Sequence, residues 1–194
     1  LRTTLPQKED KEMRIPTDAE VKALLEYTKG GPYEIFFKLA ASCGLRRSEI
    51  YAITGSDVQG NILTINKACV LDEDGNKIIK TTKTTSSTRT LYIPQDIADA
   101  IKEKGYAVKG MPDSVTSFMD DYCRDNKIEP KFTVHSLRHY FVSTLSDKGI
   151  SDENIIKLSG HKTDYVMKRV YRHAKNVEQA KQEASNIMSE LLFS

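Results

Sequence analysis

A change in the spacing of apolar residues sets the strongest limit on the fold of this chain. Most of its apolar residues recur at helical intervals, but between residues 61 and 93 they alternate with polar ones, as on a half-buried strand. Asp74-Gly75 is a hairpin-turn signal between two apolar pairs, Val70-Leu71 and Ile78-Ile79. The run Arg89–Ile93 is typical of a further strand. The pattern predicts a mainly α chain with a small three-stranded antiparallel β-sheet, an α+β fold.

Helical spacing accounts for most of the chain outside this segment. Thr17 and Glu20 form a capping box that starts the first helix, and Gly30-Gly31 ends it. The second helix begins near Pro32, and a short helical piece follows over 46–53. The later predicted helices cover residues 95–104, 113–126, 135–148, 152–159, 163–172 and 176–192. Residues 1–16 lack periodicity and are predicted to be a linker, with no domain boundary evident after residue 17.

Composition excludes several classes of protein. The 29 Lys and Arg residues nearly balance 27 Asp and Glu, so any nucleic-acid surface must come from local basic patches. Three cysteines without a CxxC pair cannot close a disulfide framework, which favours a reducing compartment. No apolar run approaches the roughly 20 residues that span a bilayer, and no signal peptide opens the chain. We therefore expect a cytoplasmic protein without membrane contacts.

Two clusters of candidate functional residues occur in the first half of the chain. Arg46 and Glu49 are three residues apart and share a helix face, although such a pair alone is more often a surface ion pair. Lys80, Lys83 and Arg89 belong to a basic hairpin, whose side chains can follow a phosphate backbone or enter a groove. Taken alone, a solvated basic hairpin is the simpler interpretation.

Two further clusters occur in the second half. His135 and Arg138 stand at a predicted helix start, where free N–H groups favour an anion. His135 and His139 are a weaker candidate zinc pair, because a Ser stands where metalloproteases have Glu. His161 follows a glycine at a helix end, and Tyr171 lies in a basic neighbourhood formed by Lys168, Arg169 and Arg172.

Taken together, these clusters suit one chemical task. Two arginines, a lysine and two histidines can hold a phosphodiester whose charge rises in the transition state. A site without carboxylate pairs for a metal needs a protein nucleophile, and the phenolate of Tyr171 can form a covalent phosphoester. The residues therefore predict phosphoryl transfer without a metal or another cofactor.

Five motifs occur in order along the chain and carry a resemblance to a known family. They are CGLRRSEI at 43–50, TKTTSSTR at 82–89, HSLRH at 135–139, LSGH at 158–161 and RVYRHA at 169–174. The chain resembles the catalytic domain of tyrosine recombinases, the integrases of phages and conjugative transposons. The resemblance implies that fold for residues 17–175 and an absent N-terminal DNA-binding domain ahead of the linker at 1–16. It also implies a C-terminal helix within 176–194 that packs in trans on a neighbouring subunit, with packing on its own domain as the alternative.

The resemblance implies a role for each matched residue. The catalytic residues are Arg46, Lys83, His135, Arg138, His161 and Tyr171, with Glu49 in support. Tyr171 would attack the scissile phosphate and form a 3′-phosphotyrosyl link, while the two arginines bind the non-bridging oxygens. Lys83 would protonate the leaving 5′ oxygen, His135 would accept the tyrosine proton, and His161 would donate to the phosphate.

Two of these assignments have an alternative. Lys80 is the alternative to Lys83 as the catalytic lysine, but the family lysine lies close before the turn that leads to the last strand. Tyr165 is the rival of Tyr171, but it follows His161 by only four residues, whereas the family nucleophile follows by nine or ten. Further DNA contacts are expected from Arg47, Lys80, Arg89, Lys168, Arg169 and Arg172.

The implied function is that of a site-specific integrase, which integrates or excises a mobile element in a bacterial cell. Its implied partners are double-stranded DNA with an attachment-site core, a tetramer of the protein on that DNA, and accessory DNA-bending or directionality proteins. Alternatives are a type IB topoisomerase, which lacks a partner strand, and a DNA-binding module without chemistry. A zinc hydrolase using His135, His139 and His161 is the third, and bound zinc would reveal it.

Overall fold

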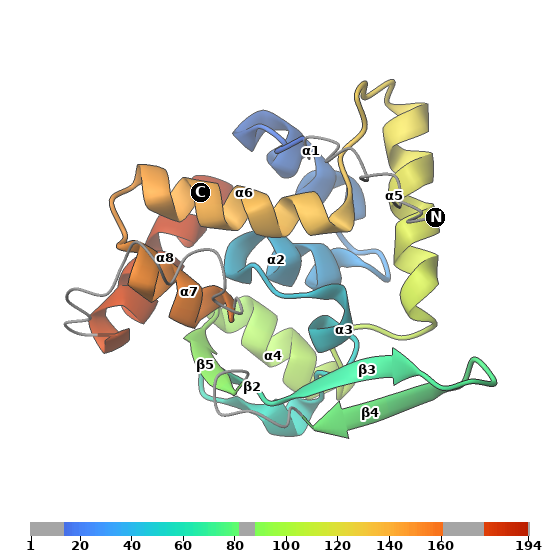
Figure 1. The fold of residues 1–194 in the computed structure, drawn as a ribbon, viewed down its shortest axis with the longest axis horizontal. Helices are drawn as coiled ribbons and strands as arrows, with labels where there is room; N and C mark the ends of the chain where they lie inside the picture. The colour runs from blue at the N-terminus through green and yellow to red at the C-terminus, as the bar shows by residue number, and fades with distance from the viewer. Residues whose placement is uncertain (1–13, 82–87, 161–176, 194) are drawn as a thin grey trace, which may run out of the picture.

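The computed structural model describes residues 14–81, 88–160 and 177–193 (Figure 1). Its helices are α1 (Asp18–Thr28), α2 (Glu34–Cys43), α3 (Arg47–Ile50), the 3-10 turn η1 (Gly55–Asp57), α4 (Gln95–Lys104), α5 (Pro112–Asp125), α6 (Val134–Asp147), α7 (Asp152–Ser159) and α8 (Val177–Phe193). From α4 onward, each described helix lies within one residue of its predicted ends, which confirms those predictions. The helix predicted over 163–172 lies outside the described residues. No helix in the described part combines the length and apolarity needed to cross a bilayer.

Helix α2 is the centre of the helical part. Its residues from Ile35 to Cys43 are buried except Lys38, and α1, α6 and α8 all pack against it. A helix that is apolar on every side is stable only inside a protein. Gly44 ends α2 with a φ of 60°, and the Phe141 ring of α6 occupies the place where a Cβ would project. The turn from α2 to α3 is therefore held tightly against α6.

The predicted three-stranded antiparallel sheet is confirmed, and the predicted hairpin at Asp74-Gly75 forms a second, two-stranded sheet. Strands β1 (Val58–Gln59), β2 (Ile62–Ile65) and β5 (Arg89–Tyr92) form a three-stranded antiparallel sheet in the order β1-β2-β5. Strands β3 (Lys67–Leu71) and β4 (Lys77–Thr81) form a separate hairpin that extends away from the helices (Figure 1).

The reason for this pairing is the burial of one face of β2 and β5. Leu63 and Leu91 lie opposite each other in the register of these strands, and both are buried. Every residue of β4 is exposed, so this strand has no buried face that could pair with β5 in the same way. The last predicted strand therefore pairs with β2, and the hairpin with the Asp74-Gly75 turn remains on its own.

Helix α8 packs on its own domain in this single chain. Ala180, Ala184, Met188 and Leu192 are buried, and α8 contacts α1, α2, α7 and β5. The Lys181 ammonium donates to the Thr90 hydroxyl at 2.7 Å, which ties the helix to β5. In this single chain, α8 thus packs on its own domain, which was the alternative considered in the sequence analysis. Its docking on a neighbouring subunit stays a prediction.

Candidate active site

The first part of the site lies at the start of α3. Arg46 precedes α3, and Glu49 is its third residue, with only 4% of its surface exposed. One Glu49 oxygen accepts the backbone N–H of Arg46 at 2.8 Å, and the other accepts its Nη1 at 2.9 Å. The pair predicted from the sequence is therefore formed, with the Glu49 carboxylate buried and the Arg46 side chain 35% exposed.

A second arginine completes the hydrogen bonding of Glu49. Arg89 donates from Nη1 at 3.0 Å and from Nη2 at 2.9 Å, one bond to each carboxylate oxygen. Burial raises the pKa of Glu49, but the hydrogen bonds and charges of Arg89 and Arg46 outweigh it and hold the pKa below its usual value. Since each oxygen already accepts two N–H groups, Glu49 orients its neighbours and is unsuited to take a proton.

Arg89, which was predicted to contact DNA, lies inside the protein in this structure. The residue is 9% exposed, and its three hydrogen bonds join β5 to α3 and α7. The sequence did contain the signal for this placement. Arg89 and Leu91 of β5, and Ile93 directly after it, occupy alternate positions and are all buried.

The second predicted arginine lies deep in the protein. Arg138 is 1% exposed, and its Nη1 donates to the carbonyls of Gly44 at 2.7 Å and Ser159 at 2.6 Å. Burial and repulsion from Arg46 lower the pKa of Arg138 to about 9, so the guanidinium stays charged at neutral pH. The side chain joins α6 to the end of α2 and to the end of α7.

Three arginines converge on the last carbonyls of α7. Arg89 Nε donates to Leu158 at 2.7 Å, Arg138 Nη1 donates to Ser159, and Arg46 Nη2 donates to Gly160. Carbonyls in the last turn of a helix lack partners within it and carry the negative end of the helix dipole, so they stabilise cations. The cluster holds three guanidinium groups and one carboxylate, an excess of positive charge that suits an anion.

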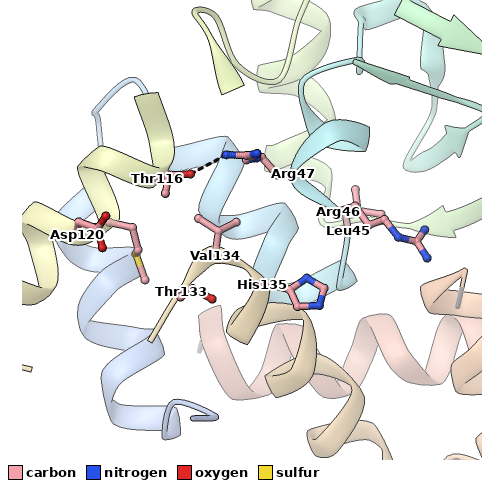
Figure 2. Close-up of a pocket in the computed structure, with 9 residues that line it drawn as sticks. Leu45, Arg46, Arg47, Thr116, Asp120, Thr133, Val134 and His135 are labelled. Atoms are coloured by element: carbon pink, nitrogen blue, oxygen red, sulfur yellow. Dashed lines mark hydrogen bonds between the residues drawn. The ribbon is translucent and has the colours of Figure 1, made fainter. Parts of the chain in front are cut away.

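The predicted His135 lies beside this cluster. It belongs to the first turn of α6, which Thr133 caps by accepting the Ser136 N–H. Together with Arg46 it lines a pocket of about 310 Å³ (Figure 2). The other lining residues are Leu45, Arg47, Thr116, Met119, Asp120, Thr133 and Val134.

Arg47 points away from Arg46 and holds α3 against α5. Its Nη1 donates to the Thr116 hydroxyl at 2.7 Å (Figure 2). The same Nη1 donates to Asp113 at 3.0 Å. Its side chain remains 40% exposed, so a contact with DNA stays a prediction. Arg47 therefore contacts α5, whereas the adjacent Arg46 contacts Glu49 and Gly160.

The two histidines of α6 are held neutral near pH 7. Their rings lie edge to face with centroids 4.9 Å apart. Partial desolvation lowers the pKa of both, and the positive charge of Arg138 lowers it further. A neutral imidazole can accept a proton, which is the role predicted for His135.

The same shift predicts a loss of stability in mild acid. The unfolded chain protonates His135 and His139 near pH 6.5, whereas the folded chain does so only at lower pH. As pH falls through 6.5, the unfolded state binds more protons, so the free energy of unfolding decreases. Urea unfolding at pH 7.5 and 5.5 measures this, and His139→Gln is expected to decline less than wild type. An equal decline in both proteins would contradict the assignment.

Gly160 gives a prediction about the arginine cluster. A Cβ there would lie 2.6 Å from Arg89 Nη1, and the residue has a φ of 66°. Gly160→Ala is expected to lower the free energy of unfolding by about 1–2 kcal/mol for the backbone alone, and by more because Arg89 must move. Gly105→Ala is the matched control, since Gly105 ends α4 with a φ of 79° and has open space around it. Equal losses in urea unfolding would show that Arg89 does not occupy this place.

The remaining predicted residues divide into two groups. Lys80 is exposed on β4, opposite Ala68 in the hairpin. Outside the described residues lie Lys83, Tyr165, His161, Tyr171, Lys168, Arg169 and Arg172. Among residues 14–81, 88–160 and 177–193, no group of three or more His, Cys, Asp or Glu side chains is placed to bind a metal ion.

Comparison with known proteins identifies relatives of this chain. A XerC-like tyrosine recombinase of Caldanaerobacter subterraneus subsp. tengcongensis is 24% identical over 206 residues, covering 88% of this chain and 53% of that protein. An integrase of a Staphylococcus phage is 26% identical over 183 residues, with coverage of 80% and 51%. The chain thus spans about half the length of these curated relatives.

A solved structure shares the fold. The integrase of the Tn1549 transposon, in complex with transposon right-end DNA, has a TM-score of 0.68 and 16% identity, covering 97% of this chain and 69% of that one. The predicted mainly α fold with small antiparallel sheets is therefore confirmed. The sequence of residues 15–178 also matches the Phage integrase family, and that range contains all five motifs. This chain therefore belongs to the Phage integrase family.

Proposed function

We propose that this chain is the catalytic part of a site-specific DNA recombinase that cleaves and rejoins strands through a tyrosine. One observation carries the proposal most strongly. Arg46 and Arg138 come from distant parts of the sequence and bind successive carbonyls, Gly160 and Ser159, directly before His161 in the chain. Two guanidinium groups brought together in this way can clamp the non-bridging oxygens of one phosphodiester.

The proposed reaction is a pair of transesterifications. The Tyr171 oxygen bonds to phosphorus, and the bond from phosphorus to the 5′ oxygen breaks. His135 accepts the tyrosine proton and Lys83 supplies one to the leaving oxygen, which becomes a 5′-hydroxyl. His161 donates a hydrogen bond to the phosphate. A 5′-hydroxyl of the partner strand then reverses the step, so the energy of the ester bond is retained and no metal or other cofactor is needed.

The electrostatics of the described residues support these roles. Glu49 has all its hydrogen-bonding positions filled by Arg46 and Arg89, so it is proposed to orient Arg46. Arg138 donates to the backbone carbonyls of Gly44 and Ser159, which hold its guanidinium beside Arg46. Its positive charge is proposed to stabilise the extra negative charge of the transition state.

The proposed partners follow from the same reaction. Exchange between two duplexes needs double-stranded DNA with an attachment-site core and four copies of the protein. Accessory proteins that bend DNA or set direction are proposed as further partners. A bacterial cytoplasm is the proposed location. The proposed DNA contacts outside the catalytic residues are Arg47, Lys80, Lys168, Arg169 and Arg172.

A nicked suicide substrate tests the proposal. The DNA carries the attachment-site core of the element, and a nick lets the short cleaved fragment diffuse away so that the covalent intermediate accumulates. We expect a slow-migrating, protease-sensitive protein–DNA adduct on a denaturing gel. Bound DNA without an adduct would instead indicate a binding module. Relaxation of a supercoiled plasmid that lacks the core would favour a type IB topoisomerase.

A further inference from the structure

We propose that Arg89 is a positioning residue, which holds Arg46 in the orientation needed to bind the scissile phosphate. The inference rests on the proposed function, because it assigns a role within the same reaction. Arg89 itself is buried under Gly160 and Glu49, so it is placed to act through these neighbours rather than on the DNA.

Both anchors of the Arg46 side chain are also neighbours of Arg89. Arg46 Nη1 binds Glu49, whose two oxygens are held by Arg89. Arg46 Nη2 binds the Gly160 carbonyl, and the Arg89 guanidinium lies against the Gly160 Cα, with Nη1 2.6 Å from where a Cβ would be. Arg89 Nε fixes the same segment through the Leu158 carbonyl. A displacement of Arg89 therefore moves both groups that hold the Arg46 side chain, Glu49 and the Gly160 carbonyl.

Competition between Arg46 and Arg89 for the Glu49 carboxylate explains why Glu49 needs a second arginine. A buried carboxylate with Arg46 as its main partner would favour a bidentate pair with that guanidinium. Arg89 takes one bond on each Glu49 oxygen, so Arg46 gives a single Nη bond and keeps Nη2 turned toward Gly160. The charged groups around Glu49 are Arg46, Arg89 and Arg138, the last acting at longer range.

The chemistry of the position is specific for arginine. A guanidinium presents a planar fork and a third donor at Nε, which here fit the two oxygens of Glu49 and one carbonyl. A lysine ammonium keeps the charge but cannot make this bidentate contact together with the Nε bond. The glycine at residue 160 leaves the space in which the planar group lies.

The test compares Arg89→Met and Arg89→Lys with Arg124→Met, a control at an exposed arginine of α5 whose partners are Asp121 and Asp125. Single-turnover adduct formation is measured on the nicked substrate at saturating protein, and the DNA dissociation constant is measured separately. We expect Arg89→Met to slow adduct formation about 100-fold while the dissociation constant changes by less than about threefold. Arg89→Lys should recover only part of the rate, and Arg124→Met should match wild type.

A measurement without DNA separates the inference from the proposed function. Side-chain NMR relaxation of the Arg46 guanidinium reports its order, and backbone amides of α2 and α6 report whether the variant is folded. We expect Arg46 to become mobile in Arg89→Met while those amides stay in place. Unchanged Arg46 order in a folded variant would overturn the inference, as would an unchanged cleavage rate. A wild-type chain that forms no adduct would count against the proposed function, and the NMR comparison would still decide the role of Arg89.

Should Arg89→Met fail to fold, Arg89→Lys decides the question. It keeps the positive charge near Glu49 and most of the side-chain volume, so it changes the geometry of the contacts more than the net charge. A folded Arg89→Lys with wild-type rate and wild-type Arg46 order would show that charge alone is sufficient. That result would overturn positioning by the guanidinium fork.

Discussion

Tyr171→Phe is expected to abolish the covalent protein–DNA adduct while leaving DNA affinity within about threefold of wild type. The change removes one oxygen, which in the proposed reaction is the atom that bonds to phosphorus. Loss of a protein nucleophile lowers turnover by about 10⁴-fold or more, because the remaining groups can only bind and polarise the phosphate. The adduct on the nicked suicide substrate and a binding assay with the same DNA are measured side by side.

Tyr165→Phe is the matched control for this experiment. The two tyrosines are six positions apart, and both follow His161 in the sequence. We expect Tyr165→Phe to form the adduct at nearly the wild-type rate. Loss of the adduct in Tyr165→Phe and its retention in Tyr171→Phe would move the nucleophile to residue 165. Retention in both single variants would reject a unique tyrosine nucleophile at either position.

The helices could be predicted well because their signals are local. Thr17 accepts the Glu20 N–H, as the capping box indicated, and Gly160 ends α7 in the left-handed conformation. Caps and apolar spacing depend on residues within one or two turns, so they can be recognised in the sequence without knowledge of the tertiary structure. Strand pairing depends on which faces become buried, so the pairing of β5 with β2 could not be predicted from local signals.

The candidate site could be predicted residue by residue but not as an arrangement. The motifs selected Arg46, Glu49, His135 and Arg138, which the structure brings together. The groups that hold them are mainly backbone carbonyls at Gly44, Ser159 and Gly160, and a carbonyl has no sequence signature.

Arg89 illustrates how one signal can conceal another. Its basic neighbours in the hairpin indicated a surface role, whereas its alternation with Leu91 and Ile93 indicated burial. The alternation was the better guide, because burial of a strand face is cooperative along the strand. A charged residue in register with buried ones is then expected to have a buried partner of opposite charge, which here is Glu49.

The convergence on α7 links stability with the proposed chemistry. Arginine side chains from α6, β5 and the start of α3 meet at the end of one short helix. Each contact satisfies a carbonyl and also brings positive charge toward the place where an anion would bind. The same contacts that hold these elements together therefore keep the cations close to one another before an anion binds.

Arg138→Ala is expected to lower both stability and the rate of adduct formation. Removing a fully buried side chain leaves a cavity and takes a donor from the Gly44 and Ser159 carbonyls. We expect a loss of about 2–4 kcal/mol in the free energy of unfolding, measured in urea. Loss of a donor to the transition state is expected to slow adduct formation by about 10²–10³-fold, measured in single turnover at a temperature where the variant remains folded.

Arg138→Lys separates these two effects, because it keeps a cation and most of the buried volume. A lysine can donate to one or both carbonyls, but it does not present the planar fork that a phosphate accepts in a bidentate way. We expect it to recover much of the lost stability and only a small part of the lost rate. If the rate recovered in proportion to stability across Arg138→Ala, Arg138→Lys and wild type, Arg138 would be a structural residue, and the phosphate clamp would rest on Arg46 alone.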